Sequence, residues 1–303
     1  MSGKRPEPSF FDLGMNAKWD QDRFSPEEKA AFVAWYNEFH GTGDLKLVPF
    51  VPFLMEHLPR QFKDYRRWFT FIEESRDGVA LPFGVSVLLF LHLYVVIANE
   101  KGILYEILAS RRLGLSKAVV MDTIAYAFLS GGPAAINAVA TLSDEYLKSS
   151  WPDDAPATYE WPADWVPNPA AFRSGMDLST NELSAADVAA LKAWHTAAHG
   201  APPRHVDLWA KLHPRAYKAT RVRYERALGN ALPAQLPPLY TLNLAAVRLQ
   251  RELMRSSILH ARRLGVKRHQ VVQTLYWAFF YGGDLVMEAA GDAVGDLLEA
   301  WPS

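Results

Sequence analysis

The sequence predicts an all-α protein made of two tandem helical domains that are related by internal duplication. Apolar side chains recur at helical spacing in both halves, and no stretch of alternating β-branched residues indicates a strand. In addition, the stretch over residues 113–140 occurs a second time, beginning at Leu264. A long repeat of this kind is typical of a duplicated structural unit.

The repeat is recognised by identical residues at a constant spacing. At an offset of 151 residues the two copies share identical residues that include Leu113/Leu264, Gly114/Gly265 and an Ala-Phe-x-x-Gly-Gly segment at residues 127–132 and 278–283. Upstream, His40 matches His199 at an offset of 159, and Arg66 matches Arg221 at an offset of 155. Short deletions in the loops of the second copy explain this drift.

We therefore expect a first helical repeat over residues 1–150 and a second over residues 171–303. Between them, residues 151–170 form a strap rich in Pro and Trp. Its prolines and tryptophans are Trp151, Pro152, Pro156, Trp161, Pro162, Trp165, Pro167 and Pro169. Since a solvated linker would not carry three indoles, we expect this strap to pack across the domains.

Composition excludes several classes of function. Lys and Arg number 32 against 33 Asp and Glu, so no basic excess points to nucleic acid or to an anionic membrane. The absence of cysteine excludes disulfides and thiol chemistry. The first residues lack the apolar core of a signal peptide, and the longest apolar run, residues 85–98, is too short to span a bilayer. We expect a soluble cytoplasmic protein.

Five helical segments are expected in the first half, over residues 25–40, 61–74, 83–98, 103–112 and 117–129. Ser25 and Ser116 are suited to capping the first and last of these helices. Gly114 is suited to ending a helix, and Gly131-Gly132 precedes a further helix that starts at Pro133. The cations of the segment at residues 61–74 are interpreted as a solvated face.

Residues 127–138 read Ala-Phe-x-x-Gly-x-Pro-x-x-x-Asn-Ala. On this segment the repeated stretch resembles the alkylhydroperoxidase D-like superfamily, which includes the carboxymuconolactone decarboxylases. The second copy departs from the pattern, with Asp284 in place of the proline and Glu288 in place of the asparagine. The resemblance covers roughly 60 residues in each half. It implies an all-helical fold that usually forms homo-oligomers.

The resemblance supplies a scaffold and a pocket location without the family's catalytic residues. Its peroxidases use Cys-x-x-Cys and a following His on the helix before the glycine turn, and its decarboxylases keep that His. In this chain the corresponding residues are Asn99, Gly102, Glu106, Gln250, Leu253 and Ser257. Peroxidase activity of that type is therefore excluded.

The first half offers four candidates for acid–base catalysis. Glu106 stands where the family places its His, and Tyr105 precedes it. His92 lies in an apolar helix, where burial can tune an imidazole toward proton transfer. Tyr126 could donate a hydrogen bond to an oxyanion. Each of these residues also has a simpler interpretation as part of the core.

The second half offers Ser257, the counterpart of Glu106, and His260, which is four residues after Ser256. His195 and His199 are also four residues apart, a spacing that can bind a transition metal. Against a metal site, His199 precedes a glycine as His40 does, which favours a role at a helix end. We therefore assign no metal and no cofactor.

These observations favour a cofactor-independent lyase, decarboxylase or isomerase that uses acid–base chemistry on a small aromatic or lactone-like substrate. The alternative is a non-catalytic protein that binds a ligand or only assembles on a degenerate scaffold. A metal-dependent hydrolase is a third hypothesis, which would require bound metal.

Overall fold

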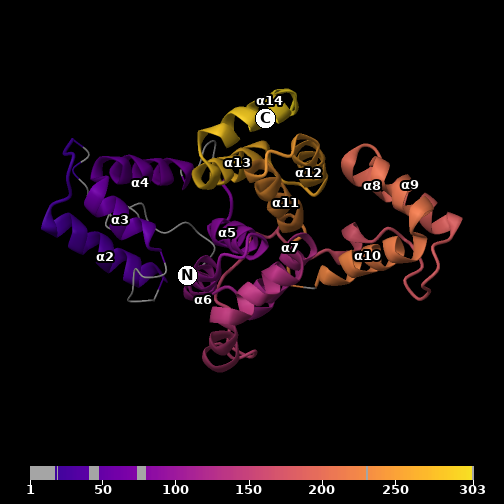
Figure 1. Cartoon of the computed structure of the whole chain (residues 1–303), viewed down its shortest axis with the longest axis horizontal. Coiled ribbons are helices and arrows are strands. Elements are labelled where there is room, and N and C mark those ends of the chain that lie inside the picture. Colours follow the sequence, from indigo (N-terminus) through magenta and orange to yellow (C-terminus); the bar gives the residue numbers. More distant parts are fainter. Residues whose placement is uncertain (1–17, 19, 41–47, 74–79, 230, 302–303) are drawn as a thin grey trace. The chain divides into compact units, whose positions relative to one another are not determined.

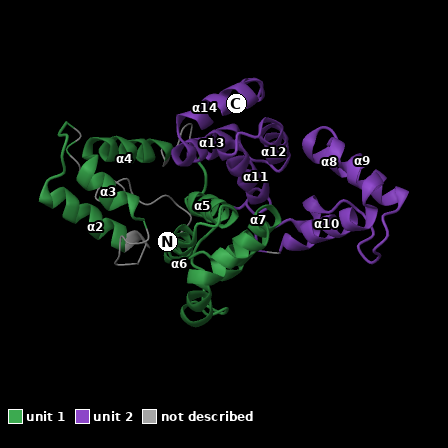
Figure 2. Cartoon of the chain, viewed as in Figure 1, with its two compact units in different colours: residues 1–162 green, residues 163–303 purple. Residues whose placement is uncertain are grey.

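The computed structural model describes residues 18, 20–40, 48–73, 80–229 and 231–301. Within these ranges every regular element is a helix, apart from an isolated bridge between Pro167 and Pro233. The all-α prediction is therefore confirmed. Internal contacts divide the chain into two compact units, Met1–Pro162 and Ala163–Ser303 (Figure 2).

Unit 1 contains two groups of helices (Figure 1). Its described elements are α2 (Pro26–His40), α3 (Phe50–His57), α4 (Pro59–Glu73), α5 (Gly84–Val96), α6 (Glu100–Arg112), α7 (Lys117–Glu145) and the π-helical turn Tyr146–Ser150. Helices α5, α6 and α7 pack against one another, and α3 packs on α4. Contacts between α2 and α6 join the two groups.

Unit 2 has the same order of helices after a short 3-10 helix, Pro169–Phe172. Its helices are α8 (Ala185–His199), α9 (Arg204–Leu212), α10 (Pro214–Ala227), α11 (Leu236–Val247), α12 (Arg251–Arg263), α13 (Arg268–Gly282) and α14 (Asp284–Glu299). Here α8 packs on α12, as α2 does on α6 in unit 1.

The predicted helix ends in the first half are confirmed. The Oγ atoms of Ser25 and Ser116 accept hydrogen bonds from the third backbone N–H after each, both at 3.2 Å. Gly114 ends α6 with φ +83°, a left-handed conformation that costs little without a Cβ. Gly265 takes φ +81° after α12.

Helix α7 consists of two helices that meet at a kink, as predicted. Gly132 at the kink has non-helical φ 64° and ψ −160°, Pro133 follows it, and the second helix runs to Glu145. Residues Lys117–Ser150 are long and apolar enough to cross a membrane by length and composition, a test that core helices of soluble proteins also pass. The non-helical backbone at Gly132 interrupts a straight span of this segment.

The strap is held in two parts. In unit 1, the Tyr159 hydroxyl accepts a hydrogen bond from the Gly84 N–H at 3.0 Å, and Trp151 is buried. In unit 2, the Ala234 N–H donates to the carbonyl oxygen of Val166 at 3.0 Å. The boundary between the units, at Pro162, therefore falls within the strap, and each part packs on its own unit.

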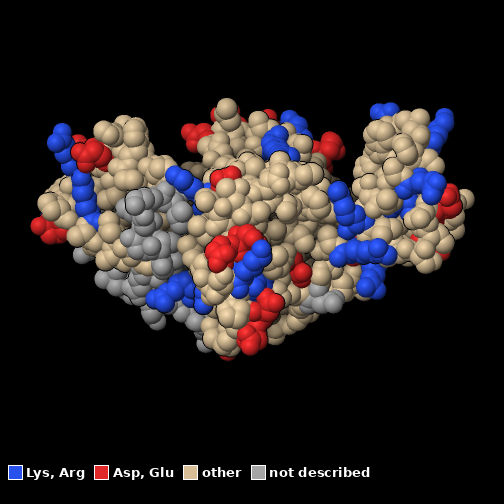
Figure 3. Space-filling view, turned by 60° about the horizontal axis from the view of Figure 1, so that its bottom comes forward, with Lys and Arg blue, Asp and Glu red and all other residues tan. Residues whose placement is uncertain are grey.

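Charged side chains of both signs lie on the molecular surface. The face drawn in Figure 3 carries both Lys and Arg and Asp and Glu, with acidic groups gathered near its centre and basic groups toward its right. This distribution agrees with the nearly balanced count of charges in the sequence.

Candidate functional site

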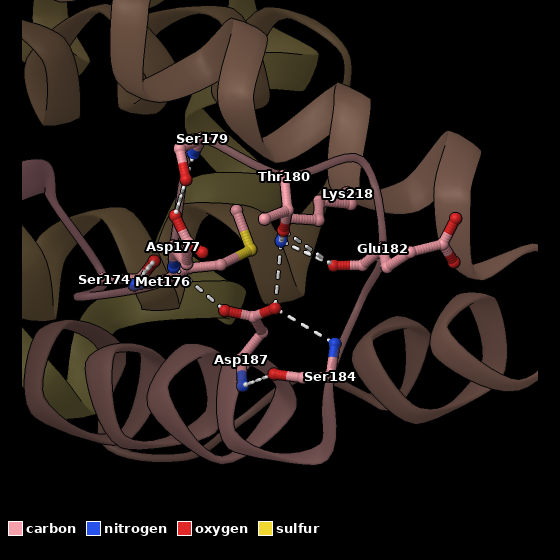
Figure 4. Close-up of polar contacts among 9 residues, drawn as sticks. All are labelled: Ser174, Met176, Asp177, Ser179, Thr180, Glu182, Ser184, Asp187 and Lys218. Atoms are coloured by element: carbon pink, nitrogen blue, oxygen red, sulfur yellow. Dashed lines mark hydrogen bonds and ion pairs between the residues drawn. The ribbon is translucent and has the colours of Figure 1, made fainter.

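In unit 2 a buried lysine ties α10 to α8 (Figure 4). The Lys218 Nζ donates to Asp187 Oδ2 at 3.0 Å, to Thr180 Oγ1 at 2.8 Å and to the Glu182 carbonyl at 2.5 Å. Burial alone would raise the pKa of Asp187. The hydrogen bonds from Ser184 and Lys218 outweigh it and lower the pKa of Asp187 to about 2, so this carboxylate is ionised at neutral pH.

Unit 1 repeats this network between α4 and α2. The Lys63 Nζ donates to Glu28 Oε1 at 3.1 Å and to the carbonyls of Lys18 and Arg23 at 2.8 and 3.0 Å. The Ser25 N–H donates to Glu28 at 2.7 Å. Since each lysine fills all three of its donor positions, this network is a structural tie.

The interpretation of residues 61–74 as a solvated cationic face is wrong for two of the cations. Lys63 and Arg66 are 0% and 7% exposed, while Arg60 and Arg67 are exposed. Residues three apart share a helix face, and this face of α4 packs on α2. The sequence match of Lys63 and Arg66 with Lys218 and Arg221 marks positions that both halves share, but it does not show that they are buried.

Arg221, one turn after Lys218, is fully paired. Its guanidinium lies over the rings of Trp194 and Tyr224, at 4.0 and 4.5 Å from their centroids. Its Nε donates to Glu225 Oε1 and its Nη2 to the Phe172 carbonyl, both at 2.8 Å. A buried charge in this setting is compensated by an anion and by hydrogen bonds.

Arg66 is buried against rings without an anion. Its guanidinium lies 4.3, 4.7 and 5.6 Å from the ring centroids of Phe69, Trp35 and Phe32. Its Nε has no hydrogen-bond partner in the part of the chain that is described. Burial lowers the pKa of Arg66 to about 10, which leaves the group charged at neutral pH.

Glu106 and Tyr105 lie on α6, next to the junction with α2. Glu106 is 4% exposed, and no residue among those described forms a hydrogen bond or an ion pair with its carboxyl group. Burial raises its pKa well above the usual value, because desolvation disfavours the charged carboxylate. Tyr105 stacks on Tyr36 with centroids 5.7 Å apart, and desolvation raises the pKa of its phenol.

The structure brings His92 and Tyr126 together at a different interface, between α5 and α7. His92 is fully buried, and its ring centroid lies 5.6 Å from that of Tyr126. Tyr105, by contrast, packs on Tyr36 between α6 and α2. The four candidates of the first half therefore form two pairs.

In unit 2, His195, His199 and His260 gather between α8 and α12. The Nδ1 atoms of His195 and His199 are 3.1 Å apart, and the rings of His199 and His260 are 5.1 Å apart. Burial lowers their pKa values to about 3, 4 and 3. His195 and His199 lie on α8, whereas His260 lies on α12 and is distant from them in sequence. The packing of α8 on α12 brings the three side chains together.

The described residues form neither a metal site at His195 and His199 nor a hydrogen bond between Ser256 and His260. Among the described residues, no three His, Asp or Glu side chains are placed to hold a metal ion. The hydroxyls of Ser256 and Ser257 both donate to the Leu253 carbonyl, at 3.1 and 2.7 Å, rather than to His260. Such back-bonding is the usual state of serine inside a helix.

Comparisons of the chain with protein-family models, with curated proteins and with solved structures found no match. The geometry of these side chains is therefore the basis for a function.

Proposed function

We propose that the protein is an acid–base enzyme, a cofactor-independent lyase, decarboxylase or isomerase, in which Glu106 is the proton donor. The observation that carries the proposal is the buried carboxyl group of Glu106, which has no hydrogen-bond partner among the described residues and whose pKa is raised by burial. A carboxyl with a raised pKa in a desolvated setting is typical of catalytic acids. Its substrate is a small aromatic or lactone-like molecule.

In this proposal Glu106 donates its proton to a carbanion or enolate carbon of the substrate as the bond to the departing group breaks. The phenol of Tyr105 donates a hydrogen bond to the oxygen on which negative charge develops. The Glu106 carboxylate then recovers a proton from water, which completes the cycle. General acid catalysis of this kind contributes about 10²–10⁴-fold to the rate.

The test is turnover of a panel of small lactones and β-keto acids by Glu106→Gln. This variant keeps the shape and neutrality of the carboxyl but cannot transfer a proton, so activity should fall by about 10²–10⁴-fold. The control is Ser257→Ala at the matching position of unit 2, which should keep its activity. Activity of the unchanged protein should fall as pH rises through the raised pKa of Glu106. Equal activity of Glu106→Gln and the unchanged protein would refute the proposal.

A non-catalytic ligand-binding or assembly protein is the second candidate, and one observation favours it. Aromatic rings fill much of the core near α2, since Phe32 meets Phe62 edge to face at 5.3 Å and Tyr36 stacks on Tyr105. On this alternative, no substrate of the panel is turned over by the unchanged protein.

Internal duplication is part of the proposal. It is supported by the shared order of helices and by the lysine networks of Lys63 and Lys218. It is also supported by Ala98 and Leu249, which take φ 58° and 56° at positions 151 residues apart. Like the family that the repeat resembles, the protein is proposed to form a homo-oligomer, which light scattering on the purified protein would test.

A further inference from the structure

The two buried arginines are matched in position but not in partners. In unit 2, Glu225 Oε1 accepts hydrogen bonds from Arg221 Nε at 2.8 Å and from the Ser174 N–H and hydroxyl at 3.0 and 2.6 Å. The carboxylate thus neutralises the guanidinium inside the protein. Glu225 follows Arg221 by four residues, so the two share a helix face.

In unit 1 the residue four positions after Arg66 is Thr70. Its side chain is shorter than that of glutamate and uncharged, and its hydroxyl donates to the Arg66 carbonyl at 3.1 Å. None of the described acidic residues forms an ion pair with Arg66. Unit 1 therefore has the buried arginine, and among its described residues no carboxylate pairs with it.

A buried guanidinium without an anion is costly, because removing the charge from water must be offset by hydrogen bonds and an opposite charge. The rings of Phe69, Trp35 and Phe32 supply only cation–π attraction. They leave the planar N–H donors of Arg66 available for an acceptor, and Nε has none. The donor geometry of a guanidinium matches a carboxylate.

We infer that Arg66 binds the carboxylate of a small organic acid with a flat apolar body, where Glu225 supplies this group in unit 2. The surrounding rings would pack against the apolar body. The inference rests on the proposed function, because this acid is taken as the substrate of Glu106. Tyr105 connects the two groups, since its phenol interacts electrostatically with both Arg66 and Glu106.

The experiment is calorimetric titration of the full chain with benzoate. We expect one site on the unchanged protein, and at least tenfold weaker binding of the neutral analogue benzyl alcohol. Arg66→Met removes the cation and should lose benzoate binding. Thr70→Glu keeps the cation and supplies an internal carboxylate, so it should also lose binding by at least tenfold. Conversely, Glu225→Thr leaves Arg221 without its carboxylate. This variant should bind benzoate at Arg66 as tightly as the unchanged protein does, and it should gain a second benzoate site at Arg221.

Absence of benzoate binding by the unchanged protein would overturn the inference, as would unaltered binding by Thr70→Glu. The latter variant decides the matter even if Arg66→Met fails to fold. Glu106→Gln separates this inference from the proposed function, because it should bind benzoate normally. Benzoate binding without turnover that depends on Glu106 leaves the site standing and removes the enzyme proposal. If turnover depends on Glu106 but benzoate does not bind, the enzyme proposal stands and the carboxylate site at Arg66 is removed.

Discussion

The helices that begin the two units share one frame and differ in how their charges are balanced. In both, a fully buried lysine ties two helices through a carboxylate, as Lys63 does with Glu28 and Lys218 with Asp187. The arginine of the next turn has Glu225 as its partner only in unit 2. A single position, occupied by Thr70 or by Glu225, thus separates a cation that is satisfied internally from one that lacks an anion.

The junctions with the following helices differ in a second way. In unit 1 Tyr105 stacks on Tyr36, and Glu106, the next residue of α6, is buried. In unit 2 His195, His199 and His260 lie together. Burial raises the pKa of the carboxyl in unit 1 and lowers the pKa values of the imidazoles in unit 2, so it favours the uncharged form of the group in both.

The largest expected effect on the free energy of unfolding comes from removing the buried lysine that each unit contains. Lys218→Met and Lys63→Met each leave a buried carboxylate without its cation, which should lower the free energy of unfolding by about 3–5 kcal/mol. Urea titration followed by tryptophan fluorescence measures this loss. Lys148→Met, which removes an exposed pair with Asp144, is the control and should change little. A small effect at Lys218 would mean that the networks do not hold these helices together.

Exchanging the residues at the position that differs should have the next largest effect. Glu225→Thr leaves Arg221 buried with only the Phe172 carbonyl and its rings, and should destabilise unit 2 by about 2–3 kcal/mol. Thr70→Glu should stabilise unit 1 by about 1 kcal/mol, because it gives Arg66 a partner. Hydrogen exchange of α4 and α10 amides reports each unit separately. Destabilisation by Thr70→Glu would show that a carboxylate does not fit beside Arg66.

The smallest effect for a single side chain of a buried cluster is a difference in acid sensitivity. The pKa values of His195, His199 and His260 are lowered to about 3–4, while in the unfolded chain they are about 6.5. The unfolded chain binds more protons between these values, so their contribution to stability is complete above pH 6.5 and is lost as pH falls toward 3–4. At pH 5 the loss is on the order of 1–2 kcal/mol for each imidazole.

Hydrogen exchange at pH 7 and pH 5 would measure this loss in α8 and α12. His260→Gln should reduce the dependence on pH without affecting α2 and α6, which hold none of these three imidazoles. If α2 and α6 lose protection as steeply as α8 and α12, the cluster is not the cause.

Much of the fold was predictable because it depends on local signals. The caps at Ser25 and Ser116 and the helix end at Gly114 follow from hydrogen-bonding groups and backbone freedom within a few residues. The break at Gly132 within α7 follows in the same way from a glycine that takes a positive φ and from the proline after it.

The candidate sites also contain features that the sequence shows and features that depend on tertiary packing. By itself the sequence determined an all-helical chain with a repeated pattern. Glu106 was singled out by the family resemblance, because it stands where that family places its His. Only the tertiary structure decided that Lys63 and Arg66 are buried, and that His260 joins His195 and His199. The burial and pairing of a side chain depend on which helices pack together. These contacts join residues that are distant in sequence, so they exist only once the chain has folded.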